Sequence, residues 1–227
     1  MESFGSIWRG LDWSVLSDML LRVVPALLCI TLHELCHGLA AYRLGDDTAK
    51  RAGRLTLNPL RHIDVMGLLM MLLFRFGWAK PVPVNMYRLH DPKRDMSLVA
   101  LSGPLSNLLL AILALFLYGV LLTPLEKSAV GGVVSELILT TATLSVSLAV
   151  FNIIPIPPLD GSKILFSLLP DRVYSRVLRY ERYGMIVLLV LVATGLLGRP
   201  LGTASMWLFS KLWCFAKWGF LLVQRVF

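Results

Sequence analysis

Hydrophobic residues in this chain gather into long runs that short polar segments separate. The runs at about residues 15–42, 97–122 and 133–156 are each long enough to cross a bilayer as a helix, which rises about 1.5 Å per residue. The stretch at 65–76 has only about a dozen residues, too few for a comfortable crossing, and is predicted to be re-entrant or tilted. The pattern therefore predicts several membrane helices around one short insertion.

The end of the chain has a different pattern. A polar and basic segment at 160–182 is followed by two shorter apolar helices, expected at 185–197 and 204–223 with a break at 198–200. These helices are predicted to form a hairpin, or one of them to lie along the membrane interface. Together the runs predict an all-α polytopic membrane protein with about five to six membrane segments.

Composition supports a membrane protein. Of the 227 residues, 56% are hydrophobic and 16% are charged, where a soluble domain has about 25% charged residues. The net charge of +8 comes from short basic clusters between the apolar runs, which is typical of a signal that orients membrane helices and not of a nucleic-acid interface. The lipid bilayer is an expected partner and nucleic acid is not, and the three cysteines do not suggest a disulfide framework.

The basic clusters also predict an orientation. Segments 43–61, 80–94 and 160–182 carry most of the arginines and lysines and are expected in the cytoplasm. This places the N-terminus outside and requires the stretch at 65–76 to enter and leave on the same side. The C-terminal ends of the spans at 15–42 and 133–156 then meet in the cytoplasmic leaflet.

Candidate chemistry lies in the first span, where His33, Glu34 and His37 form an HExxH pattern. On a helix, residues four apart share a face, so the two imidazoles can bind one Zn²⁺ with Glu34 beside its open position. Zinc lowers the pKa of a bound water to about 7, and the neighbouring carboxylate can accept its proton as general base. Ionisable groups within an apolar span are costly without a shared partner, which favours this interpretation over two unrelated histidines.

A catalytic zinc needs a third protein ligand at the same depth. Asp160 follows Pro155, Pro157 and Pro158, which remove backbone donors and must end the helix that begins near residue 133. The predicted topology brings this end of the span at 133–156 next to His33 and His37. Other candidates are weaker: Glu126 and Glu136 fall on the outer side, Asp46 and Asp47 lie too close in sequence, Cys36 is not needed, and His62 and His90 are expected to be loop residues.

Three motifs in order resemble one family. Residues 33–37 (HELCH), 103–107 (GPLSN) and 152–161 (NIIPIPPLDG) are similar to the signatures of the site-2 protease family of intramembrane zinc metalloproteases. The resemblance covers about residues 15–165. It implies one zinc per chain, in a peptidase that cleaves within or near transmembrane segments of membrane proteins, as in regulated intramembrane proteolysis.

The resemblance also implies roles for single residues. His33, His37 and Asp160 would bind zinc, Glu34 would be the general base, and Asn152 would orient the substrate or the developing oxyanion. Structural support would come from the remaining motif positions, Gly103, Pro104, Asn107, Pro155 and Gly161.

Segments 53–60 and 77–85 further resemble the compact bacterial branch of that family, which lacks peptide-binding and nucleotide-sensing domains. That branch implies a bacterial cell membrane with the active site toward the cytoplasmic leaflet. The expected organisation is an interfacial segment at 1–14, a catalytic membrane core at 15–165, and an amphipathic segment with C-terminal membrane helices at 166–227.

Two short segments alternate in the period of a strand. Residues 54–58 and 80–84 flank the re-entrant stretch and are predicted to pair as a small β-hairpin or sheet at the cytoplasmic membrane surface. Pro81 and Pro83 would restrict the second strand to an edge, where an extended substrate could add as a further strand. An ordinary surface turn is the alternative.

Two other functions remain open at this point. A membrane scaffold that has lost activity would usually have lost one of Glu34, His33, His37 and Asp160, and all four are present. A metal or proton transporter could use the same ligands, but transporters often carry paired broken helices and only one broken span is apparent. The sequence identifies neither the natural substrate nor the oligomeric state.

Overall fold

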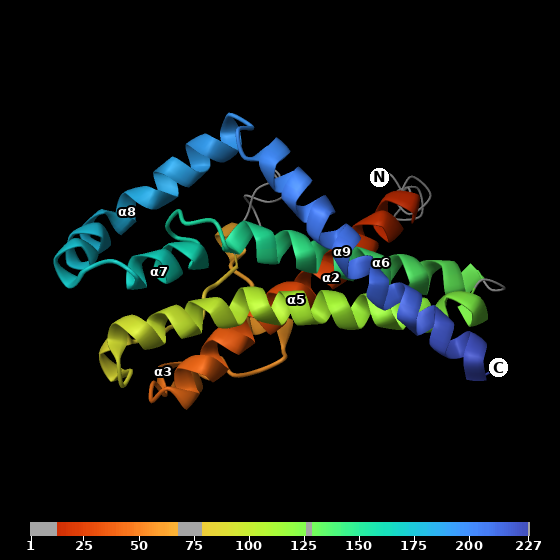
Figure 1. The fold of residues 1–227 in the computed structure, drawn as a ribbon, viewed down its shortest axis with the longest axis horizontal. Helices are drawn as coiled ribbons and strands as arrows, with labels where there is room; N and C mark the ends of the chain where they lie inside the picture. Colours follow the sequence, from red (N-terminus) through yellow and green to blue (C-terminus); the bar gives the residue numbers. More distant parts are fainter. Residues whose placement is uncertain (1–12, 68–78, 126–128, 227) are drawn as a thin grey trace, which may run out of the picture.

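The protein is a bundle of long helices (Figure 1). The computed structural model describes residues 13–67, 79–125 and 129–226. The elements in chain order are α2 (Trp13–Arg43), α3 (Thr48–Arg51), the 3-10 helices η1 (Pro59–Arg61) and η2 (Met86–Arg88), α5 (Pro92–Leu125), α6 (Ala129–Asn152), α7 (Asp160–Ser167), α8 (Asp171–Ala193) and α9 (Gly198–Val226). The prediction of a mostly helical protein is confirmed.

Four helices in the described ranges are long and apolar enough to cross a membrane, which makes this an integral membrane protein. They comprise Leu21–Arg43, Pro92–Pro124, Val130–Asn152 and Gly198–Arg225. The first three match the predicted long spans. The predicted re-entrant stretch at 65–76 lies almost wholly outside the described residues, and residues 65–67 begin a helical turn.

The C-terminal part differs from its prediction. The helix break falls at residues 194–197, where Gly195 has φ +70°, and not at 198–200. Pro200 lies in the first turn of α9, where a missing N–H leaves no hydrogen bond unmade. Helix α8 is apolar only over Tyr183–Ala193, and this part is too short to cross a bilayer at about 1.5 Å per residue. The predicted count of five to six segments is therefore not supported.

Helix α5 is the centre of the bundle and contacts α2, α6, α7 and α9. The apolar core includes Leu115, Ala142 and Ala216 from α5, α6 and α9. A Cβ on Gly119 would overlap the carbonyl of Ala216, and a Cβ on Gly219 would overlap the carbonyl of Phe116. These glycines let the backbones of α5 and α9 touch where the helices cross.

The predicted β-hairpin is absent: neither of its segments, both of which are described, forms a strand. Their backbone groups bond elsewhere. The Arg54 side chain donates to the carbonyl oxygens of Lys80 and Pro81, and the Val82 N–H donates to a carboxylate of α2. Since Pro81 and Pro83 have no N–H, too few free groups remain for a ladder.

The proline-rich end of the span predicted at 133–156 behaves as expected. Helix α6 ends at Asn152, the chain turns through residues 153–159, and Asp160 opens α7. A Cβ on Gly161 would overlap the carbonyl of Ile153, so the glycine allows α7 to fold back closely against the turn. This reversal returns Asp160 toward the bundle.

Candidate metal centre

Two histidines of α2 face the same side of the helix. His33 and His37 are four residues apart and both are buried. Their Nε2 atoms lie 3.0 Å apart. One helix therefore directs two imidazole nitrogens to the same point.

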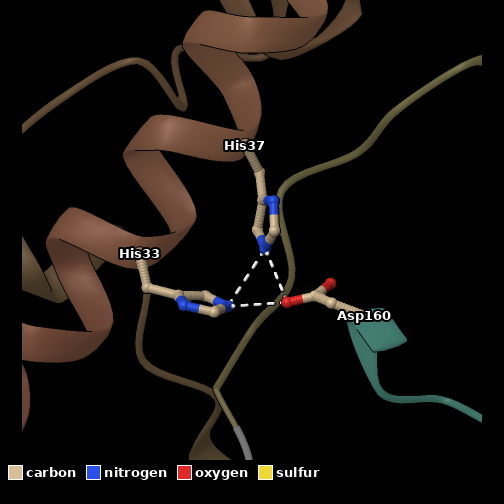
Figure 2. A group of neighbouring side chains, drawn as sticks. All are labelled: His33, His37 and Asp160. Atoms are coloured by element: carbon tan, nitrogen blue, oxygen red, sulfur yellow. Dashed lines mark hydrogen bonds and ion pairs between the residues drawn. The ribbon is translucent and has the colours of Figure 1, made fainter. Parts of the chain in front are cut away.

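Asp160 joins this pair from α7. Its Oδ2 lies 3.1 Å from His33 Nε2 and 3.2 Å from His37 Nε2. Figure 2 shows the three side chains pointing toward one another. The structure thus brings together residues that are more than 120 positions apart in the chain, as the predicted topology required.

A main-chain carbonyl of α5 orients His37. The Nδ1 of His37 lies 2.7 Å from the carbonyl oxygen of Val99. Because a carbonyl only accepts hydrogen bonds, this nitrogen carries the proton and Nε2 presents its lone pair to the group. The Ser102 hydroxyl donates to the same carbonyl over 2.6 Å, which holds the acceptor in place.

Asn107, also on α5, orients His33. The Nδ2 of Asn107 lies 3.1 Å from the Nδ1 of His33. The Oδ1 of Asn107 is buried and has no hydrogen-bond partner in the described ranges. Rotating the amide so that Oδ1 faces the ring satisfies that oxygen, which then accepts the His33 Nδ1–H. In this arrangement the Nε2 of His33 also presents a lone pair.

Gly103 makes room for both rings. A Cβ at this position would overlap ring atoms of His33 and His37. Pro104 follows it inside α5. The imidazoles therefore lie directly against the backbone of α5, where Val99 and Asn107 can reach them.

The three side chains fit a zinc ion. Three ligand atoms of a tetrahedral zinc, each about 2.0–2.2 Å from the metal, lie about 3.3 Å from one another, close to the 3.0–3.2 Å found here. Oδ2 of Asp160 is buried without a hydrogen-bond partner in the described part of the chain. Two imidazole lone pairs and a carboxylate oxygen that converge at such distances suit a metal cation between them.

Glu34 lies next to the group on α2, and its carboxylate has a main-chain partner. Its Oε2 accepts a hydrogen bond of 2.8 Å from the N–H of Val82. The partner belongs to the extended segment before η2. The candidate base is thus held by a part of the chain outside the three motifs.

The other predicted site residues lie at the ends of elements. Asn152 is the last residue of α6, and its amide donates to the carbonyl of Leu148 over 3.0 Å. Pro155 is in the exposed turn that follows, and Gly161 is buried in α7. The catalytic role of Asn152 stays a prediction.

The alternative metal ligands of the sequence do not join the group, which in the described ranges consists of His33, His37 and Asp160. Cys36 is half-buried. His62 is buried, and its Nε2 lies 3.0 Å from the carbonyl of Thr56. It is a structural residue of the loop.

Sequence reasoning missed the partners that orient the site. Val99 and Val82 act through main-chain atoms, which carry no signature in the sequence. Ser102 directly precedes the Gly103–Pro104 pair, and this position next to a motif was the one sequence signal that it could belong to the site. Such partners become visible only when the helices are placed against one another.

Comparisons with known proteins agree with the motifs. A protein of Bacillus subtilis (strain 168) named "Putative zinc metalloprotease YwhC" is 40% identical over 198 residues, which cover 85% of this chain and 86% of the relative. The "Putative zinc metalloprotease Rip2" of Mycolicibacterium smegmatis is 30% identical, over 87% of this chain and 76% of the relative. The protein of that name from Mycobacterium tuberculosis (strain H37Rv) is 31% identical over 81% of this chain and 71% of the relative.

No solved structure matches the chain at a significant level. The family model described as Peptidase family M50 matches residues 118–198, which include α6, the proline-rich turn and Asp160. The relatives extend the match to most of the chain. This chain belongs to Peptidase family M50.

Proposed function

We propose that this protein is an intramembrane zinc metalloprotease that hydrolyses peptide bonds within or near transmembrane segments. The observation that carries the proposal is the group of His33, His37 and Asp160 with Glu34 beside it. All four side chains belong to helices of a membrane bundle. The relatives named as zinc metalloproteases support the same activity.

His33, His37 and Asp160 would hold one zinc per chain. When bound, zinc supplies a water of lowered pKa and polarises the substrate carbonyl. Glu34 accepts the proton of the attacking water and delivers it to the leaving amine. Gly103 keeps the space above α5 clear for the rings, and Asn152 is assigned to orienting the substrate at the end of α6.

A cavity of about 970 Å³ between α2 and α6 supports a substrate from the bilayer. Ile30 and Thr31 on its wall precede Glu34 by four and three residues, so they share a face of α2 with it. Leu139 and Leu144 form part of the opposite wall. An apolar passage along this face would lead a transmembrane segment to the general base.

The proposal is tested by purifying the full chain in detergent, measuring bound zinc, and assaying cleavage of a panel of single-span membrane substrates. Glu34→Gln is expected to keep about one zinc per chain and to lose cleavage by at least about 100-fold, the usual contribution of a general base. Glu126→Gln, the same change in the connection between α5 and α6, is the matched control and should cleave as the wild type does.

Three outcomes would contradict the proposal or its mechanism. Zinc at one per chain with no cleavage of any substrate would favour a scaffold, and zinc flux in proteoliposomes would favour a transporter. Cleavage that survives Glu34→Gln would remove Glu34 from the mechanism.

A further inference from the structure

Residues 79–85 form an extended strap that crosses α2 at Glu34. Its first part is fixed by main-chain and side-chain bonds. The N–H of Lys80 donates to the carbonyl of His62 over 2.9 Å. The buried guanidinium of Arg54 donates to the carbonyl oxygens of Lys80 and Pro81, and also to that of Arg61.

The end of the strap is fixed independently. The N–H of Asn85 donates to Oδ2 of Asp46 over 2.6 Å. Asp46 is fully buried and also accepts hydrogen bonds from the N–H and the hydroxyl of Thr48. Both ends of the strap are therefore tied to the segment between α2 and η1.

Val82 lies between these anchors. Because Pro81 and Pro83 have no N–H, Val82 has the one main-chain donor of this tripeptide, and Oε2 of Glu34 accepts it. The Val82 side chain is buried and packs near Gly38, where an added Cβ would lie 3.2 Å from its Cγ1. Gly38 stands one helical turn after Glu34, so the strap lies close to α2 at this turn.

We propose that the main-chain N–H of Val82 is a positioning group for the general base, an inference that rests on the proposed peptidase activity. One carboxylate oxygen of Glu34 is held by this N–H, and the other is left to take the proton. A hydrogen bond to an ionised acceptor is about twice as strong as one between neutral groups. The strap thus fixes the rotamer of Glu34 before substrate arrives. It does so through a main-chain group, so no further side chain enters the site.

The flanking prolines make the contact selective. A residue before proline is confined to extended backbone, so Lys80 and Val82, which precede Pro81 and Pro83, are both held in that region. Neither proline can compete for the carboxylate. The sequence Pro81-Val82-Pro83 therefore presents one donor in a stiff frame.

The test removes the Val82 N–H and keeps the flanking Pro81 and Pro83. Val82→Pro removes the N–H within an extended segment that already contains Pro81 and Pro83. Val84→Pro is the matched control, since the Val84 N–H makes no hydrogen bond among the described residues. Val82→Ala keeps the N–H and shortens the side chain, so it separates the loss of the donor from the loss of packing.

We expect Val82→Pro to retain about one zinc per chain and the wild-type KM, and to lower kcat by about 10- to 100-fold, the range for a misplaced catalytic group. Val84→Pro should keep kcat within about threefold, and Val82→Ala should recover most of the kcat that Val82→Pro loses. Unchanged kcat in Val82→Pro would overturn the proposal. A rise in KM alone would also overturn it, because the N–H would then serve the substrate.

A change of amide to ester at position 82, which replaces the N–H by oxygen and keeps the valine side chain, settles the case in which Val82→Pro does not fold. The ester variant should show the same fall in kcat with zinc retained. Full kcat in the ester would overturn the proposal. If the wild type itself cleaved nothing, the proposed function would fail first, and the bound zinc would still be measurable.

Discussion

Single atoms of α5 decide how the two histidines are presented. The Val99 carbonyl sets the protonated nitrogen of His37, and the Asn107 amide, once rotated so that Oδ1 faces the ring, does the same for His33. Second partners of this kind orient a metal-binding imidazole and raise its basicity. The resemblance assigned Asn107 a packing role, whereas its side chain lies within hydrogen-bond distance of a candidate ligand.

Replacement of Asn107 is expected to weaken zinc binding. Asn107→Leu removes the acceptor for the His33 Nδ1–H and should lower zinc affinity by about 10- to 100-fold. Asn107→Asp keeps an acceptor at this place and should lose less. Competition with a chelator of known affinity measures both.

Ser106→Ala is the control for this pair. The Ser106 hydroxyl donates to the carbonyl of Gly103 within α5, so its loss should leave zinc affinity unchanged. Equal affinities of the Leu and Asp variants would show that Asn107 does not act as an acceptor.

Among the elements, those with a strong local signal were predicted and those formed by long-range contacts were not. Pro155, Pro157 and Pro158 ended α6 where the missing N–H groups required it. The alternating residues at 80–84 resembled a strand, but the ladder was pre-empted by Arg54 and Glu34, which bond to the same backbone. Sequence periodicity contains no information about such competition.

The loop between α2 and α5 should respond to pH through Asp46. Burial would raise the pKa of Asp46, but hydrogen bonds from Thr48 and Asn85 outweigh it, and the pKa lies below its ordinary value of 3.8. Since the folded pKa is depressed, this stabilisation is complete above the ordinary pKa and is lost as pH falls through the folded pKa.

Asp46→Asn is therefore expected to cost about 1–2 kcal/mol at neutral pH, because charged acceptors bond more strongly. Thermal unfolding of both proteins in detergent between pH 3 and 7 measures the difference. The gap should be constant down to about pH 5 and narrow below about pH 4. A gap that is independent of pH over the whole range would contradict the assignment to the Asp46 carboxylate.

At the scale of the whole molecule, residues of α2, α5 and α7 meet at the metal group. The site could be anticipated because the basic loops predicted the relative directions of the spans, and that prediction placed Asp160 beside the HExxH helix, where the structure has it. The last two helices were harder, since the break at residues 194–197 depends on Gly195 and not on the more conspicuous Pro200. The apolar pattern located the long spans, whereas the exact position of this helix break depended on a single glycine.

The orientation itself leads to a prediction about labelling. In a background without Cys29, Cys36 and Cys214, a cysteine at Val130 should react with a membrane-impermeant maleimide in intact cells, because the start of α6 is expected outside. A cysteine at Lys50 should react only after the membrane is opened. Both positions are exposed, so accessibility within the fold does not differ between them. The reverse pattern would place the metal group near the outer leaflet.

The close crossing of α5 and α9 has a consequence in time. Gly219 is synthesised 100 residues after Gly119, which takes about 5–20 s at about 5–20 residues per second. Every residue of the metal group has been synthesised before α9 begins. The order of synthesis therefore lets His33, His37 and Asp160 meet while the glycine face of α5 is still open to lipid, and α9 closes that face last.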